Sequence, residues 1–259
     1  MEIPDKLYDS TPIIMNKKVL IYIPTRNTAQ TIEKTYNLIP EHIKKEAQFV
    51  VVDNASTDNS VEVAENLGLK VLIHETNRGY GGSNKTGFEY AKKIGVDIFL
   101  IMHSDCQYDP TIMDRILEPV LSGEADLVLG SRIMGKKALT GGMPWWKYIS
   151  NRFLTWLENT VLGVNISEYH TGYRAYTMEV LNRIPYEETS DDWVFDGEIL
   201  FQIANLGYRI KDVPIPTTYQ GPISSITFTT GVVYGLSVVF LSFKYLFHKW
   251  GIVKQKMFM

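Results

Sequence analysis

The sequence predicts an α/β fold in which a doubly wound, mostly parallel sheet is flanked by helices. Short apolar runs alternate with segments of helical periodicity through the first half of the chain, which is the pattern of repeated strand–helix–strand units. The runs are continuously apolar, as is typical of strands buried on both faces. Polar residues directly follow these runs, and in open α/β sheets the carboxyl edge of the strands binds ligands.

The expected elements alternate in order along the chain. Strands are predicted at 17–23, 48–52, 70–74, 98–102 and 126–130. Helices are predicted from Thr28 or Thr31 to residue 39, and at 60–67, 85–94 and 110–121. Threonine caps helix N-termini, and the glycines at 68 and 95 suit helix ends in the left-handed conformation. The short connections between these elements favour a parallel sheet with right-handed crossovers.

Composition and charge exclude some classes of function. The 259 residues carry a formal net charge of −3, which does not favour a nucleic acid as partner. The single cysteine, Cys106, excludes an internal disulfide and is typical of a reducing compartment. Residues 1–16 are expected to form a polar N-terminal arm, because they lack the apolar core of a signal peptide.

The stretch at 98–110 has the strongest signature of a ligand site. Its apolar run ends abruptly at His103, and Asp105 and Gln107 follow on alternate residues. In an extended backbone alternate side chains point the same way, so these three are expected to converge beyond the strand. Their oxygen atoms suit Mg²⁺ or Mn²⁺, which often bridge to substrate phosphates. A strand followed by a polar turn explains the same residues without a metal.

Two other features fall at the same edge of the predicted sheet. Asp53 ends the second strand, and parallel strand ends meet at one edge. The glycine-rich segment 77–84 resembles a phosphate loop only loosely, because it lacks both the spacing and the lysine of the known motifs. The alternative is that Gly79, Gly81 and Gly82 merely permit a tight turn.

Six motifs, in order along the chain, resemble those of a known family. They are PTRN at 24–27, VVDNASTD at 51–58, NRGYGGSNKTGFEYA at 77–91, DCQYDP at 105–110, LGSR at 129–132 and HTGYRAY at 170–176. Together they resemble the family 2 glycosyltransferases of GT-A fold, within them most of all the dolichol-phosphate mannose synthase-like branch. The resemblance extends from about residue 17 to about residue 219.

The resemblance implies a nucleotide-sugar site in the first half of the chain. Pro24, Arg26 and Asp53 match positions that hold the base and the ribose of the donor. An aspartate suits this task because its carboxylate accepts a hydrogen bond from a base N–H. Lys85 matches a basic position that lies near the nucleotide.

The resemblance also implies a divalent metal, either Mg²⁺ or Mn²⁺, that stabilises the leaving diphosphate. The family motif is D-x-D with a glutamine two residues on. Asp105 matches its second aspartate and is the expected catalytic metal ligand, Gln107 matches the glutamine, and His103 replaces the first aspartate. Imidazole suits Mn²⁺ better than Mg²⁺. This replacement therefore favours Mn²⁺, weakens metal binding, or leaves His103 in contact with phosphate.

On the acceptor side, Arg132 matches an arginine that faces the acceptor's phosphate, for which a guanidinium fork is well suited. A surface arginine paired with a carboxylate is the alternative. The segment 168–174 is the second acceptor-side match, with Thr171 and Arg174 as expected acceptor-binding residues. His170 differs from the residue common at its position and is not assigned as a base.

Four acids between 190 and 198 open a helix that is predicted to extend to residue 206. The helix dipole favours acids in a first turn, which explains them as capping residues. In transferases with hydroxyl acceptors a carboxylate here acts as general base, whereas a phosphate acceptor is already an anion and needs none. Asp192 and Asp196 are expected site residues, and together with Asp191 they would orient sugar hydroxyls if no base is needed.

Two stretches indicate a membrane surface. An amphipathic helix at about 145–162 combines aromatic residues with scattered cations, as at a bilayer interface, although an aromatic core helix gives the same pattern. The tail at 221–259 contains four lysines and no acid, and cations near an anionic surface are favourable. The uncharged run 226–243 is diluted by Thr and Ser. We therefore expect an amphipathic helix in the membrane plane, with a spanning helix as the alternative.

The predicted domains are the arm at 1–16, a GT-A glycosyltransferase domain at 17–220 and the membrane-associating tail at 221–259. The expected function is inverting transfer of a sugar from a donor of GDP-mannose or UDP-glucose type to a polyprenyl or dolichyl phosphate. The expected location is peripheral, on the cytoplasmic side of the cell membrane, with a homo-oligomer as an open option. The alternatives are a transferase that acts on a sugar hydroxyl in glycan assembly, and a non-catalytic nucleotide-sugar-binding protein, which His103 supports.

Overall fold

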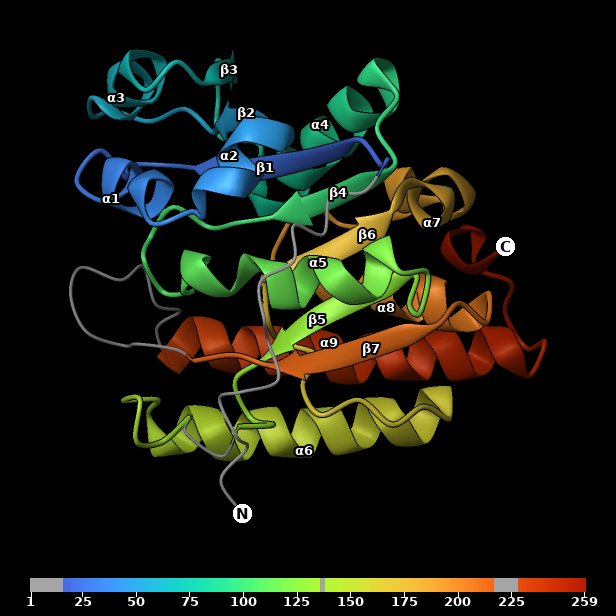
Figure 1. Ribbon diagram of the computed structural model, residues 1–259. Coiled ribbons are helices and arrows are strands. Elements are labelled where there is room, and N and C mark those ends of the chain that lie inside the picture. The colour runs from blue at the N-terminus through green and yellow to red at the C-terminus, as the bar shows by residue number, and fades with distance from the viewer. Residues whose placement is uncertain (1–15, 136–137, 217–227) are drawn as a thin grey trace.

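The computed structural model describes residues 16–135, 138–216 and 228–259 (Figure 1). Apart from residue 16, the predicted N-terminal arm lies outside these residues, as does the segment 217–227 at the predicted boundary between domain and tail. Within them, seven strands form one sheet in the order β3-β2-β1-β4-β6-β5-β7. The strands are β1 (Val19–Thr25), β2 (Gln48–Asp53), β3 (Lys70–Ile73), β4 (Ile98–Ile101), β5 (Leu127–Ser131), β6 (Arg174–Thr177) and β7 (Ile210–Pro214).

The predicted α/β class is confirmed. All five predicted strands are present with ends shifted by at most two residues. β1 pairs in parallel with β2 and β4, and β2 pairs in parallel with β3. The sequence did not predict β6, which is antiparallel to both β4 and β5, or β7, which pairs in parallel with β5. β6 contains Arg174 and β7 contains Lys211, so neither strand is an uninterrupted apolar run. The hydrophobic pattern therefore did not predict them.

Helices cover both faces of this sheet, which gives three layers (Figure 1). The α-helices are α1 (Ile32–Asn37), α2 (Glu41–Glu46), α3 (Ser60–Asn66), α4 (Gly79–Ile94), α5 (Met113–Leu121), α6 (Trp145–Leu162), α7 (Met178–Arg183), α8 (Phe195–Asn205) and α9 (Phe228–Lys249). Short 3₁₀ helices are η2 (Pro110–Ile112), η3 (Tyr186–Glu188) and η4 (Lys256–Phe258). Alternate residues of β1 explain the layers. Leu20 and Tyr22 pack against α4, α7 and α8, whereas Ile21 and Ile23 pack against α1, α2, α3 and α5.

Two details of the helix predictions are wrong. α1 begins at Ile32, and although Thr31 occupies the cap position, its side chain makes no capping hydrogen bond. Its hydroxyl donates instead to the carbonyl oxygen of Thr28, 3.3 Å away. The glycine-rich segment is not a loop either, since α4 already begins at Gly79. The glycines in its first turn are therefore needed for another reason.

That reason is a close backbone approach between α4 and the segment before α8. A Cβ atom at Gly79 would lie 2.3 Å from the carbonyl oxygen of Asp191, and one at Gly81 would lie 2.3 Å from that of Ser190. In the glycine form, the Gly81 amide donates to the Asp191 carbonyl oxygen at 2.7 Å. Gly79 also has a φ of +76°, which glycine adopts without strain.

The helices α6 and α9 lie next to each other at the bottom of Figure 1. α6 has the predicted bounds, and α9 covers most of the predicted tail. Both expose large apolar side chains: Trp145, Ile149, Phe153 and Trp156 on α6, and Val232, Val233, Leu236, Phe240, Phe243 and Phe247 on α9. By length and composition α9 is long and apolar enough to cross a membrane, and 22% of its most apolar window is buried.

Candidate active site

One cavity of about 940 Å³ collects side chains from the carboxyl ends of the parallel strands. Its polar end is formed by the segments that follow β1, β2 and β4 and by the start of α4. It then extends to a wall made by α6 and α9, where Phe153, Leu154, Val232, Leu236 and Val239 line it. The cavity is therefore polar where it meets the sheet and apolar between the two amphipathic helices.

Of the predicted donor residues, Pro24 and Arg26 line the polar end, whereas Asp53 does not. The Asp53 carboxylate is buried and accepts hydrogen bonds from Ser56, including its backbone N–H at 3.0 Å. The next residue, Asn54, faces the cavity in its place. Its side chain accepts from the Arg78 N–H at 2.8 Å and donates to the carbonyl oxygen of Gly79 at 3.0 Å. Asn54 thus ties the end of β2 to the start of α4.

Lys85 does not line the cavity. Its ammonium group donates to the Asp191 carboxylate at 2.8 Å and to the carbonyl oxygen of Thr189 at 2.5 Å. This lysine therefore reinforces the contact between α4 and the segment before α8. Its contact with the nucleotide remains a prediction.

The residues of the predicted metal motif, His103, Asp105 and Gln107, all line the cavity. The extended backbone that was expected to align them is wrong, because β4 ends at Ile101 and the chain then bends. Cys106 has a φ of +59°, and the Asp105 carboxylate accepts the Gln107 N–H at 3.0 Å. A tight turn, rather than strand alternation, brings the three residues to the same wall.

His103 differs from its two neighbours in the direction of its imidazole. The ring stacks on Tyr80 with centroids 5.9 Å apart. Its buried Nε2 has no hydrogen-bond partner among the described residues, and a Cβ at Gly172 would lie 2.3 Å from it. Burial lowers the pKa of His103, so the ring is held neutral.

The donor atoms present fit a sparse divalent-metal site. Within the described residues, no three His, Cys, Asp or Glu side chains gather closely enough to hold a metal by themselves. Of the predicted metal motif, the cavity instead offers one carboxylate, from Asp105, and the amide of Gln107. Mg²⁺ sites of this kind keep several waters and take one or two carboxylates together with substrate phosphates. Asp105 and Gln107 match that pattern better than the neutral, stacked His103.

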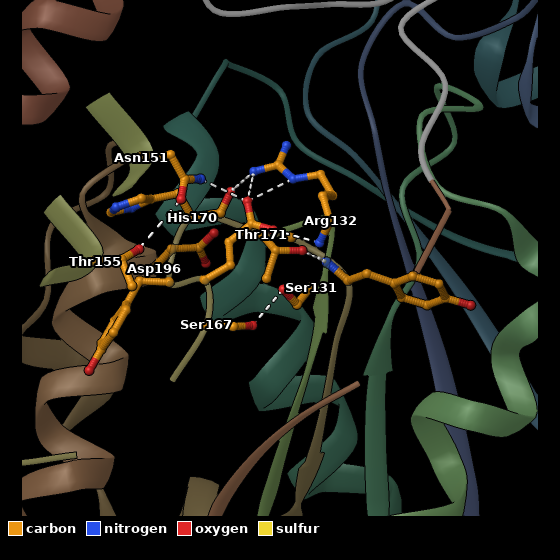
Figure 2. Close-up of polar contacts among 12 residues, drawn as sticks. Ser131, Arg132, Asn151, Thr155, Ser167, His170, Thr171 and Asp196 are labelled. Atoms are coloured by element: carbon orange, nitrogen blue, oxygen red, sulfur yellow. Dashed lines mark hydrogen bonds and ion pairs between the residues drawn. The ribbon is translucent and has the colours of Figure 1, made fainter. Parts of the chain in front are cut away.

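Arg132 lines the cavity from a buried ion pair (Figure 2). Its Nε donates to Oε1 of Glu168 at 2.8 Å, and its backbone N–H donates to Oε2 at 2.7 Å. Asn151 of α6 donates to the same carboxylate at 2.8 Å, and Figure 2 shows it reaching in from the side opposite Arg132. The guanidinium also donates to the carbonyl oxygen of His170. Arg132 is thus held in one orientation before any ligand binds.

Lys147, which the sequence did not mark as a site residue, lines the same cavity as Arg132. Burial lowers the pKa of Lys147, and the positive charge of Arg132 lowers it further. The two cations are therefore close enough to interact, although one belongs to the end of β5 and the other to the first turns of α6. The sequence did not predict that Lys147 and Arg132 would line one cavity, because sequence periodicity does not determine how α6 packs on the rest of the fold.

Thr171 and Arg174 are almost fully buried and do not line the cavity. The Arg174 guanidinium donates to the carbonyl oxygens of Thr171 at 2.7 Å and Asp196 at 3.0 Å. It also lies 3.5 Å from the Asp196 carboxylate. Arg174 therefore fixes the backbone around the cavity, and direct acceptor contact by either residue stays a prediction.

Asp192 and Asp196 both line the cavity. Asp192 is exposed, whereas Asp196 accepts a hydrogen bond from the Tyr80 hydroxyl at 3.1 Å. Burial raises the pKa of Asp196, and the nearby Arg174 opposes that shift. The exposed ring of Trp193 stacks on Tyr80 with centroids 4.9 Å apart. Tyr80 of α4 and Trp193 both line the cavity. The acidic residues at 190–198 gave no indication of either aromatic ring.

The mostly parallel sheet, with β6 reversed and the cavity at its carboxyl edge, defines the GT-A class of glycosyltransferase folds. The structure matches glucosyl-3-phosphoglycerate synthase from Mycobacterium tuberculosis with a TM-score of 0.68 and 18% identity, over 89% of this chain and 80% of that one. Another crystal of that synthase contains Mn²⁺ and uridine diphosphate. At this identity the match establishes the fold.

The chain belongs to glycosyl transferase family 2, whose family model matches residues 20–184. An uncharacterized protein of Methanocaldococcus jannaschii is 30% identical over 93% of this chain and 97% of its own length. The undecaprenyl-phosphate mannosyltransferase of Micrococcus luteus is 32% identical over 76% of this chain and 82% of its own length. The predicted family is confirmed, together with its polyprenyl-phosphate branch.

Proposed function

We propose that this protein transfers a hexose from a nucleotide-sugar to a polyprenyl phosphate, with inversion, at a membrane surface. The observation that carries the proposal is the continuity of one cavity from a polar end at the sheet to an apolar end between α6 and α9. A nucleotide diphosphate suits the first end, and a phosphate with a long apolar chain suits the second. A soluble, fully polar acceptor would not use the apolar half.

At the donor end, Pro24, Arg26 and Asn54 are placed to contact the nucleotide, and Asp105 and Gln107 would hold Mg²⁺ or Mn²⁺. When bound, such a cation neutralises negative charge on the diphosphate leaving group. Asp192 and Asp196 line the same cavity and can accept hydrogen bonds from sugar hydroxyls. With the diphosphate and the sugar hydroxyls held by these residues, the anomeric carbon of the donor would lie between the diphosphate site and the acceptor end.

At the acceptor end, Arg132 and Lys147 provide two positive charges beside the apolar groove. An acceptor phosphate oxygen attacks the anomeric carbon, a new C–O bond to that phosphate forms, and the C–O bond to the nucleotide diphosphate breaks. The acceptor is already an anion, so no side chain must remove a proton. Cations that hold and orient the phosphate are what this step needs.

The exposed apolar side chains of α6 and α9 support peripheral association with a membrane, and we propose that this is at its cytoplasmic side. Large exposed patches of Trp, Phe and Leu side chains are uncommon on helices that face water, and they mark surfaces that bind a membrane or another protein. α9 ends at Lys249 and is followed by Lys254 and Lys256, and these three cations favour an anionic lipid surface. Because α9 also packs on α6 and α8, we place it in the membrane plane, parallel to the surface.

The test is a two-stage assay with the purified full chain. A thermal-shift screen of GDP- and UDP-sugars, each with Mg²⁺ or Mn²⁺, should single out the donor, because a ligand stabilises the folded state by mass action. That donor is then incubated with a short-chain polyprenyl phosphate, and the glycolipid is identified by mass spectrometry. A stabilising donor that yields no glycolipid but glycosylates a sugar hydroxyl would refute the acceptor class.

The hydroxyl-acceptor alternative has one observation in its favour. The raised pKa of Asp196, caused by burial, suits a general base. Under our proposal Asp196→Asn lowers transfer to polyprenyl phosphate by about tenfold, the cost of weakened sugar contacts. Loss of all transfer, with a normal donor thermal shift, would favour the alternative. Asp97→Asn serves as the control, because Asp97 precedes β4, at the opposite end of the strand, and does not line the cavity.

Lys147→Gln is expected to raise the KM for the polyprenyl phosphate by about tenfold, because one charged hydrogen bond to the phosphate is lost. The donor KM should stay unchanged, and initial-rate kinetics with each substrate varied in turn measures both. Lys93→Gln removes a charge from the exposed end of α4 and is the matched control. Equal shifts in both KM values would contradict the placement of Lys147 at the acceptor end.

A further inference from the structure

Three side chains beside the acceptor end of the cavity form a chain of polar contacts that the proposed transfer does not use. Glu158 of α6 lies with its Oε2 3.3 Å from Nε2 of His170. The other imidazole nitrogen, Nδ1, lies 2.8 Å from the hydroxyl of Tyr234 on α9. His170 and Tyr234 line the cavity, whereas Glu158 is 0% exposed behind them.

Glu158 is in an environment that does not support a charge. Neither of its carboxyl oxygens has a hydrogen-bond partner of good geometry among the described residues. An ionised carboxylate buried in this way is strongly unfavourable and instead takes up a proton. Burial accordingly raises the pKa of Glu158 well above its ordinary value. The 3.3 Å separation from His170 is also longer than a charge-assisted hydrogen bond.

His170 is neutral as well. Burial, with Arg132 and Arg174 nearby, lowers its pKa to about 3. A neutral imidazole carries one proton, so one ring nitrogen donates and the other accepts. The O–H of a protonated Glu158 can donate to Nε2, 3.3 Å away, and this arrangement places the imidazole proton on Nδ1. Nδ1 then donates to the oxygen of Tyr234, and the Tyr234 O–H is left to donate elsewhere.

The direction in which these hydrogen bonds donate matters because Arg132 lies next to them. The backbone carbonyl of His170 accepts a hydrogen bond from the Arg132 guanidinium, so His170 links Arg132 to Tyr234. If Glu158 were ionised, every proton would point the other way. Tyr234 would then donate to His170 and present only lone pairs to the cavity, where they would repel an anion.

We propose that Glu158 and His170 are positioning residues that hold the Tyr234 hydroxyl as a hydrogen-bond donor to the acceptor's phosphate. This rests on the proposed transfer to a polyprenyl phosphate. Tyr234 then adds a neutral donor from α9 to the cations Arg132 and Lys147. The buried acid acts through the histidine and does not itself touch the substrate.

Steady-state kinetics of four variants tests the chain. Tyr234→Phe and Glu158→Leu should each raise the KM for a short-chain polyprenyl phosphate by about tenfold, the loss of one hydrogen bond to a charged group, with the donor KM unchanged. Glu158→Gln keeps an N–H that can donate to His170 and should stay within about twofold of wild type. Combining Tyr234→Phe with Glu158→Leu should give no loss beyond either single change, because both remove the same bond.

Tyr245→Phe is the matched control, since this tyrosine lies on the same helix and its hydroxyl contacts Asn205 outside the cavity. A merely structural role for Glu158 predicts that Glu158→Gln behaves like Glu158→Leu, or that the double variant loses the product of the two single effects. Either result overturns the proposal, as does an unchanged acceptor KM in Tyr234→Phe.

A second measurement does not depend on turnover. The ¹⁵N NMR shifts of the His170 ring report which nitrogen carries the proton. We expect the Nδ1–H form in the wild type and in Glu158→Gln, and a change in Glu158→Leu. An Nε2–H form in the wild type overturns the inference whatever the activity. Absence of any transfer to lipid phosphate by the wild type, with the Nδ1–H form observed, refutes the proposed function and leaves the tautomer assignment intact.

Discussion

Asp105→Ala is expected to lower kcat for transfer from nucleotide-sugar to polyprenyl phosphate by about 10²- to 10³-fold, the usual cost of removing one group that stabilises charge in the transition state. Asp105 supplies the single carboxylate of the predicted metal motif on the cavity wall. Its loss also removes the acceptor of the Gln107 N–H and so disturbs the second proposed ligand. The rate should be measured with saturating donor across a range of Mg²⁺ and Mn²⁺ concentrations.

The matched control is Asp97→Ala. Asp97 precedes β4 and accepts the backbone N–H of Lys18 at 2.7 Å, so it lies at the end of the strand opposite Asp105. Asp97→Ala should keep the metal dependence of the wild type. Turnover like that of the wild type in Asp105→Ala, at any metal concentration, would remove this residue from the site.

Arg132→Ala is expected to lower the free energy of unfolding by about 3–5 kcal/mol, because it leaves the buried Glu168 carboxylate without its cation. In the fraction that folds, the KM for the polyprenyl phosphate should rise more than that for the donor. Urea unfolding measures the first effect, and initial-rate kinetics measures the second. An effect confined to the donor KM would contradict the placement of Arg132.

A double variant separates stability from binding. Arg132→Met combined with Glu168→Leu removes both charges and should recover much of the lost stability, since apolar replacements of a buried pair are often neutral or better. Its acceptor KM should remain high. Arg209→Ala is the control, because Arg209 pairs with Asp126 near the other end of β5 while remaining 60% exposed. An exposed pair of this kind is worth at most about 1 kcal/mol.

The sequence was most informative where burial alone determines structure. The parallel strands β1, β2 and β4 are buried on both faces, so their apolar runs predict them without ambiguity. The site residues at the ends of these strands follow from the same pattern, because strand ends share one edge. His103 and Asp105 were therefore placed on the cavity wall from the sequence, although the turn that brings them there was not foreseen.

The rest of the site depends on how helices pack, which periodicity does not determine. Lys147 and Glu158 lie on the same predicted helix, yet one faces the cavity and the other is buried behind it. Tyr234 meets His170 only because α9 crosses beside α6. Asp53 was predicted correctly at a strand end, but its carboxylate accepts hydrogen bonds from Ser56 in the local turn and does not face the cavity.

The glycine contacts between α4 and the segment before α8 have a consequence for how this protein can diverge. Residues 106 positions apart, Lys85 and Asp191, are joined there by an ion pair, beside backbones that leave no room for a methyl group. The donor wall, formed by the start of α4, and the sugar-facing wall, formed by the segment before α8, are thus rigidly connected. A substitution that reshapes one wall will shift the other. Nucleotide and sugar preferences are therefore expected to change together across related sequences.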